Sequence, residues 1–216
     1  LHHQLEVLKT GLPEYTVVGV GREDGKTAGE YAPIFFKQAK YTLLDQNTFW
    51  LCEKPDSVGM VGWDAALTRI ATWVKLQDKK TGQILMVVNT HFDHIGTEAR
   101  RNSALLIIEK IKEIVGTSPA ILTGDFNVSE DWDAYKTITN NEFILKDAHK
   151  VAGKRTGVDF TYHNFGKIPA EKCEKIDFIF VTPQIRVISS YIPFSQLNDT
   201  LFLSDHNPEI VELEIK

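Results

Sequence analysis

Several apolar segments of this chain are bounded by a carboxylate, an amide or a histidine, and this pattern limits the fold more than any other feature. The segments are VVNTHFDH, LTGDFN, KIDFIF and LSDHNP. Short apolar runs of this kind form buried strands, and a rigid scaffold presents functional groups where its strands end. We therefore expect one cleft at the strand ends. Its side chains would be those of His91, Asp125, Asn127, Asp177, Asp205 and His206.

The remaining pattern predicts more strands than helices. A long helix is expected from Thr97, which can cap it, to Gly116, which ends it. The opening segment has leucines at helical spacing up to Gly11, and this stripe should be buried against a sheet. We find no linker or repeat that divides the chain. The sequence therefore predicts a single mixed α/β domain over residues 1–216.

The composition excludes some classes of partner. Lys and Arg number 24 against 29 Asp and Glu, so the net charge is −5. A protein that grips duplex DNA mainly by charge is normally basic, so a nucleic-acid substrate would need a local patch or a metal ion. The apolar runs are too short to cross a bilayer. Cys52 and Cys173 are far apart and lack metal-ligand spacing. We expect a soluble monomer whose compartment, cytoplasmic or secreted and periplasmic, stays open.

The residue types at the strand ends indicate phosphate chemistry. Carboxylate and amide oxygens favour Mg²⁺, Mn²⁺ or Ca²⁺ over zinc, and such an ion neutralises phosphate charge while a carboxylate or histidine handles the water. A zinc site at His91 and His94 is the alternative, but neither cysteines nor an HExxH pattern accompany them. Strand alternation would point Asp125 and Asn127 to the same side. Asp-x-Asn after a strand is also typical of a plain turn.

Taken together, the motifs GEYAPIFFK, NTHFDH, TGDFN, KIDFIFV and SDHNP resemble the endonuclease/exonuclease/phosphatase superfamily, whose fold is DNase I-like. Their order matches, and they span most of the chain. The segments GREDGKTAGEY, TFWLCEKPD and GWDAALTR look more narrowly like the bacterial branch near the deadenylase-like phosphodiesterases. The resemblance implies a four-layer α/β/β/α sandwich, with two packed sheets flanked by helices and a cleft at one end of the sheets.

The resemblance also implies roles for the water-activating and phosphate-binding residues. Asp125 would orient or activate the attacking water, and Asn127 would help to hold the phosphate. His206 would contact the phosphate, oriented by Asp177, and Asp205 beside it would be linked to the metal. The resemblance thus implies that Asp125 and Asp205 are the metal ligands, and that the metal is Mg²⁺ or Mn²⁺.

A second histidine pair follows from the same resemblance. His91 would be the other histidine that faces the phosphate, and Glu30 of the GEY motif would pair with it. A histidine bonded to a carboxylate keeps its tautomer and carries charge better. Relatives carry their main metal-binding Glu on a strand before the helix that opens this chain. We therefore expect the natural chain to extend upstream of Leu1, so that these residues are an N-terminally truncated domain.

We weigh three functions. The first is a metal-dependent phosphodiesterase that acts on phosphate esters, above all as a nuclease or nucleotide-directed hydrolase. The second is a hydrolase that cleaves phospholipids or inositol phosphates, which the net negative charge and the aromatic-rich TFWLCEKPD segment keep open. The third is a non-catalytic binding module of the same fold that has lost its metal ligand.

Overall fold

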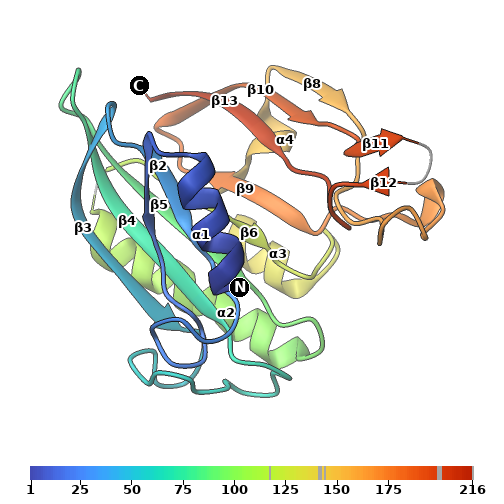
Figure 1. Cartoon of the computed structure of the whole chain (residues 1–216), viewed down its shortest axis with the longest axis horizontal. Helices are drawn as coiled ribbons and strands as arrows, with labels where there is room; N and C mark the ends of the chain where they lie inside the picture. The colour runs from blue at the N-terminus through green and yellow to red at the C-terminus, as the bar shows by residue number, and fades with distance from the viewer. Residues whose placement is uncertain (117, 141–142, 144, 199–200, 216) are drawn as a thin grey trace.

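A six-stranded sheet forms the centre of the computed structural model, which describes residues 1–116, 118–140, 143, 145–198 and 201–215 (Figure 1). Strands β5 and β6 are parallel, and the other neighbours are antiparallel. In spatial order the strands are β3 (Tyr41–Trp50), β4 (Ile70–Asp78), β5 (Ile84–His91), β6 (Ala120–Asp125), β9 (Asp177–Val181) and β7 (Lys146–Asp147).

Shorter strands pack against one face of this sheet in two separate groups. Val18 and Ile34 of the first group meet Val74 and Leu76 of the central sheet, and the second group contributes another apolar cluster around Val187. The first group is β1 (Tyr15–Val18) with β2 (Ile34–Lys37). The second is β13 (Ile210–Ile215), β10 (Ile185–Ile192) and β8 (Lys154–Gly157). A further pair is β11 (Gln196–Asn198) with β12 (Leu201–Phe202).

Helices cover the other face. Helix α2 (Thr97–Val115) and helix α3 (Asp133–Thr139) lie behind the central sheet in Figure 1. The largest apolar cluster lies between them and the sheet, and its buried members include Ile107, Ile111, Phe126, Phe178 and Phe180.

Helix α1 (His2–Gly11) lies in front of the sheet in the same view. The short helices are α4 (Ala148–Val151) and a 3₁₀ turn (Ala170–Lys172).

The mixed α/β sandwich that the sequence predicts is therefore confirmed. One local expectation is wrong. The leucine stripe of α1 is only partly buried: Leu5 is 8% exposed, whereas Leu1 and Leu8 are 51% and 47% exposed, because neighbouring elements cover only the middle of the helix. Outside the sheets, isolated bridges join Tyr162 to Glu174 and to His206.

The start of α2 also differs from expectation. Gly96, not Thr97, is the N-cap residue, and carboxylates from elsewhere accept the hydrogen bonds of the first turn. Asp64 accepts from the backbone N–H groups of Glu98 and Ala99, and Asp93 accepts from that of Gly96. A buried carboxylate next to His91 thus fixes the loop between β5 and α2. Among the described residues, every helix is too short or too polar to span a membrane.

Candidate active site

Three neighbouring strands bring their functional residues to one edge of the central sheet. His91 is the last residue of β5, Asp125 is the last of β6, and Asp177 is the first of β9. Because β5 and β6 run parallel, His91 lies in register with Asp125. Because β9 runs antiparallel to β6, Asp125 also lies in register with Asp177. Sheet geometry alone therefore gathers one histidine and two carboxylates, as the sequence predicts.

The segment TGDFN is shaped by two unusual backbone positions. Gly124 has φ +157°, and a Cβ there would lie 2.3 Å from the backbone oxygen of Thr90, so the close strand approach requires glycine. Asn127 has φ +49°, in the left-handed region that asparagine tolerates. Its backbone N–H donates to Asp125 Oδ1 at 2.9 Å, and its Nδ2 donates to the oxygen of Phe92 at 3.0 Å.

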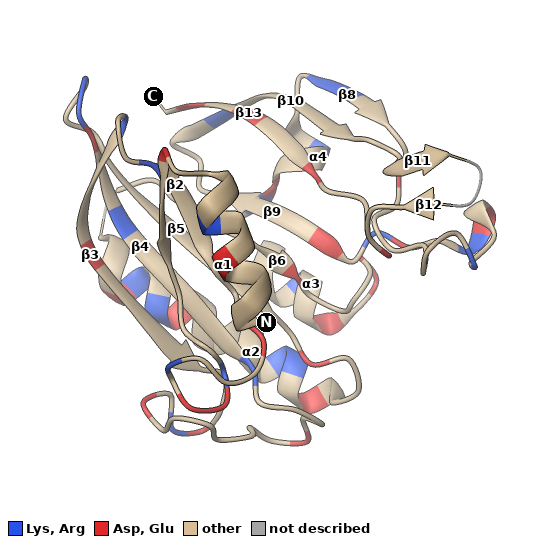
Figure 2. Cartoon of the chain, viewed as in Figure 1, with Lys and Arg blue, Asp and Glu red and all other residues tan. Residues whose placement is uncertain are grey.

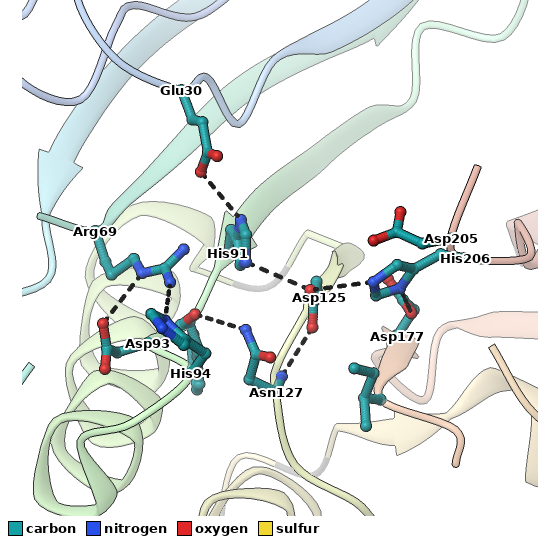
Figure 3. A network of polar contacts seen from close by, with 12 residues as sticks. Glu30, Arg69, His91, Asp93, His94, Asp125, Asn127, Asp177, Asp205 and His206 are labelled. Carbon is teal, nitrogen blue, oxygen red and sulfur yellow. Dashed lines mark hydrogen bonds and ion pairs between the residues drawn. The ribbon is translucent and has the colours of Figure 1, made fainter. Parts of the chain in front are cut away.

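Asp125 and Asn127 are therefore brought together by a turn, and the expected strand alternation is wrong here. Strand β6 ends at Asp125, so Asn127 lies beyond the pleat that would have set its direction. The turn accounts for the local hydrogen bonding, yet Asp125 Oδ2 still faces the other site residues (Figure 3). The structural and functional interpretations of this motif are thus compatible.

His206 and Asp177 form the tightest contact of the site. His206 Nδ1 lies 2.7 Å from Asp177 Oδ2, as the motif order predicts. On the opposite side of the ring, His206 Nε2 lies 4.0 Å from Asp125 Oδ2. Burial by itself would lower the pKa of His206, but the hydrogen bond and charge of Asp177 outweigh it and raise that pKa. The His206 imidazole therefore holds a second ring proton, and with it a positive charge, up to a higher pH than an ordinary histidine does.

His91 lies on the other side of Asp125. Its Nε2 is 3.3 Å from Asp125 Oδ2, and its Nδ1 is 3.8 Å from Glu30 Oε2. The expected hydrogen bond between Glu30 and His91 is thus absent, because Glu30 binds Arg22 at 2.5 Å instead. Burial, followed by the positive charges of Arg69 and Arg22, lowers the pKa of His91 to about 3. His91 is therefore neutral at physiological pH, unlike the charge-bearing role expected for it.

Asp125 and Asp177 crowd two negative charges together. Burial and the neighbouring charge of Asp177 raise the pKa of Asp125 to about 6. Asp125, Asp177 and His206 each offer a ligand atom, and these atoms lie within 4.8 Å of one another. A divalent cation would relieve the repulsion, and two carboxylates suit a hard ion such as Mg²⁺ or Mn²⁺. These donors therefore fit the expected Mg²⁺ or Mn²⁺. The group consists of Asp125, Asp177 and His206, whereas the predicted ligands were Asp125 and Asp205.

Asp205 is not part of this group of described residues, although we expected it to be a metal ligand. Its Oδ1 accepts a hydrogen bond from the Ser204 hydroxyl at 3.3 Å, and its backbone oxygen accepts from the N–H groups of His163 and Asn164. These bonds fix the turn that carries His206. Figure 3 shows the Asp205 carboxylate beside the His206 ring, on the side away from Asp177.

Sequence reasoning missed a second layer of charged residues behind His91. Arg69 lies directly before β4, Arg22 lies in the loop after β1, and both are buried. Arg69 binds Asp93 through Nε at 3.4 Å and His94 through Nη2 at 3.0 Å. His94, considered above as a zinc ligand, is thus an acceptor for an arginine. The only available signal was a single arginine placed at the head of an apolar strand.

The chain is similar to known proteins in both sequence and fold. The family model described as Endonuclease/Exonuclease/phosphatase family matches residues 11–206. An endonuclease/exonuclease/phosphatase from Bacteroides vulgatus superimposes with a TM-score of 0.97 at 64% identity, covering 100% of this chain and 82% of its own. The fold and the cluster of acids and histidines define a hydrolase. The chain belongs to the endonuclease/exonuclease/phosphatase family.

Two further relatives extend the comparison. The mannosyl-6-phosphatase of Bacteroides thetaiotaomicron has a TM-score of 0.91 at 38% identity, with 99% of this chain and 82% of that one covered. A protein of Acanthamoeba polyphaga mimivirus is 30% identical over an alignment of 220 residues that covers 97% of this chain and 80% of the viral protein. The recognition of the family from its motifs is confirmed.

Proposed function

We propose that the protein hydrolyses a phosphate ester with the help of a divalent cation. The observation that carries this proposal is the convergence of His91, Asp125, Asp177 and His206 at one sheet edge, where Asp125 Oδ2 faces both histidines. A phosphate needs positive or hydrogen-bond-donating groups around its oxygens and a base near its phosphorus. This cluster supplies both.

The roles follow from the contacts. Asp125 takes up the proton of the attacking water through its carboxylate, whose Oδ2 faces the space between the two histidines. His206, held by Asp177 in a fixed orientation, donates from Nε2 to a phosphate oxygen and carries positive charge. The neutral His91 ring lies across from it and contributes a hydrogen bond to the same phosphate.

Asp125 and Asp177 are the residues that would hold the cation. When bound, the cation neutralises charge that develops on the phosphate. Mg²⁺ or Mn²⁺ is the expected ion, because the donors are carboxylate oxygens. Asn127 completes the site by anchoring the turn below the phosphate, through its bonds to Asp125 and to the oxygen of Phe92.

A small phosphorylated compound is the substrate class that we favour. The net charge of −5 opposes charge-driven binding of a nucleic acid. Figure 2 shows acidic and basic residues interspersed over the coloured parts of the chain instead of gathered on one side. Support also comes from the relative that is a mannosyl-6-phosphatase and is 38% identical to this chain. A phosphate on a sugar is therefore the first substrate to test.

A nuclease or nucleotide-directed hydrolase is the second candidate. Trp132 lies at the start of α3, on the segment that follows the Asn127 turn, and its side chain is 44% exposed. An exposed aromatic ring can stack on a nucleobase. The same ring can also cover a sugar, so its position does not separate the two classes.

A substrate panel tests the proposal. We would compare mannose 6-phosphate, p-nitrophenyl phosphate, short RNA and DNA strands, an inositol phosphate and a phospholipid, each with Mg²⁺, Mn²⁺ and a chelator. We expect hydrolysis of at least one phosphate ester with cation and its loss with chelator. No hydrolysis of any substrate with either cation would instead favour the non-catalytic binding module.

A further inference from the structure

Residues 160–163 connect the two members of the His206–Asp177 pair. Asp177 is the first residue of β9, whereas His206 lies in the turn before β13 and in none of the described strands. Sheet register therefore does not set the distance between the two residues, which are 29 positions apart in the sequence. Thr161, which is fully buried, has hydrogen bonds both to the start of β9 and to the turn that carries His206.

The Thr161 hydroxyl fixes the start of β9. Its Oγ1 accepts the backbone N–H of Ile176 at 3.0 Å and that of Asp177 at 3.1 Å. A buried backbone N–H that loses its acceptor costs free energy, because its hydrogen bond to water has already been given up on folding. The hydroxyl thus holds Asp177 at its backbone, from which the carboxylate extends.

The backbone around Thr161 fixes the turn that carries His206. The Thr161 oxygen accepts the N–H of Asn207 at 2.7 Å. The next residue, Tyr162, forms a bridge with His206, and the centroids of the two rings lie 5.0 Å apart at an angle of 52° between the ring planes. Thr161 and its neighbour therefore connect the start of β9 to both the backbone and the ring of His206.

The hydrogen bond between His206 and Asp177 depends on this connection. His206 Nδ1 lies 2.7 Å from Asp177 Oδ2. A displacement of about 1 Å would end the bond, because such bonds extend only to roughly 3.2 Å. A carboxylate can only accept, so the bond keeps a proton on Nδ1. The other ring nitrogen, Nε2, faces Asp125 Oδ2 at 4.0 Å.

We propose that Thr161 is a positioning residue, which holds Asp177 and His206 at the separation that lets Asp177 orient the imidazole. Thr161 acts through these two residues, and His206 is the one that meets the phosphate. This inference rests on the proposed function for the role of His206, and it adds a residue from outside the cluster of acids and histidines. A purely structural role has a different consequence: a substitution would change the stability of the fold and leave the pair as it is.

Thr161→Val tests the proposal, because valine keeps the shape of threonine but lacks the acceptor, and Thr161→Ser restores the acceptor. Thr182→Val is the matched control. Thr182 is also buried and directly follows β9, and its Oγ1 accepts the N–H of Ala120 at 3.0 Å, so it lies at the opposite end of the same strand. Thermal unfolding of all variants is measured first. If Thr161→Val does not fold, Thr161→Cys, whose thiol is a weak acceptor, replaces it in each measurement.

The first readout does not need catalysis. Nitrogen–proton correlation NMR spectra of the histidine rings at alkaline pH, assigned with His206→Gln, show which nitrogen of the neutral His206 ring carries the proton. We expect the proton on Nδ1 in the wild type, in Thr161→Ser and in Thr182→Val. In Thr161→Val we expect a shift towards a proton on Nε2, because Asp177 no longer holds it on Nδ1. An unchanged proton position in folded Thr161→Val would overturn the proposal.

The second readout separates kcat from KM on a phosphate ester that the wild type hydrolyses. For Thr161→Val we expect kcat to fall by about 10- to 100-fold with a smaller change in KM, because a misplaced group weakens the transition-state contacts more than it weakens substrate binding. Thr161→Ser should recover most of kcat, and Thr182→Val should leave it unchanged. Equal losses of kcat in Thr161→Val and Thr182→Val would contradict the positioning role.

The two readouts separate the positioning role from the proposed function. If the wild type hydrolyses no phosphate ester but the His206 proton moves in Thr161→Val alone, the positioning role stands and the proposed function fails. If the wild type is active and the proton does not move in folded Thr161→Val, the proposed function stands and Thr161 has only a structural role.

Discussion

Lys175 donates a 2.7 Å hydrogen bond from Nζ to the backbone oxygen of Asp177, the residue that orients His206. The same amine lies 2.9 Å from Glu209, and both side chains of this ion pair are almost fully buried. Glu209 in turn accepts a hydrogen bond from the Ser190 hydroxyl at 3.2 Å. A buried polar network thus joins strand β10 to the start of β9, where the candidate active site begins.

We predict that Lys175→Met destabilises the protein by about 3 kcal/mol, because it leaves the Glu209 carboxylate buried without its partner. The double variant Lys175→Met with Glu209→Gln should lose less, since no uncompensated charge remains. Urea unfolding of the wild type, of Lys175→Met, of Glu209→Gln and of the double variant gives the free energies of unfolding to compare. A double variant that is as unstable as the sum of its two single substitutions would contradict this interpretation.

Asp93 should make the free energy of unfolding depend on pH in the acidic range. Burial by itself would raise the pKa of Asp93, but backbone N–H groups of the surrounding loops outweigh burial and lower it. A carboxyl group with a lowered folded pKa stabilises the fold above its unfolded pKa of about 3.9, and this stabilisation is lost as pH falls through that value towards the folded pKa.

We therefore predict that Asp93→Asn has a lower midpoint of thermal unfolding than the wild type at pH 7. The difference between the two midpoints should become smaller as the pH falls from about 5 to about 3. Asp159→Asn is the control, because the Asp159 side chain is fully exposed. It should follow the wild-type profile. If the gap between Asp93→Asn and the wild type stays constant across this range, the carboxylate is not the source of the acid sensitivity.

Substitution of Gly124 should destabilise the fold. A Cβ at this position would meet the Thr90 oxygen at 2.3 Å, in a φ region that other residues avoid. We expect Gly124→Ala to lower the free energy of unfolding by about 2 kcal/mol or more, because backbone cannot yield as a side chain can. Gly11→Ala is the control, since nothing lies within 4 Å of its Cβ and alanine favours a helix. Equal stability of the two variants would contradict the close approach.

Much of the site could be predicted from the sequence. Strand ends and motif order locate His91, Asp125, Asp177 and His206 without any knowledge of how the side chains pack. Sheet register then places His91, Asp125 and Asp177 side by side, and the hydrogen bond to Asp177 places His206 beside them. This inference failed where the chain leaves the sheet. Asn127 lies in a turn with positive φ, so the two-residue alternation of a strand does not govern it.

Long side chains were the second source of error. Glu30 lies near His91 but binds Arg22, and Arg69, directly before β4, reaches His94 in the loop after β5. Such partners depend on how far a flexible side chain extends across the fold, which no local spacing records. The same holds for Asp64, which caps α2 from a loop far away in the sequence. The expected metal-binding Glu before Leu1 stays a prediction.

Asp125 is central to the proposed function, because its carboxylate faces both histidines and belongs to the candidate cation group. The most direct measurement compares hydrolysis of a phosphate ester by the wild type and by Asp125→Asn, with Mg²⁺ and with a chelator, and uses Asp159→Asn as the control. We predict that Asp125→Asn lowers kcat by about 10²- to 10⁴-fold, that the chelator abolishes wild-type activity, and that the control is unaffected. Full activity of Asp125→Asn, or of the wild type in chelator, would contradict the proposal.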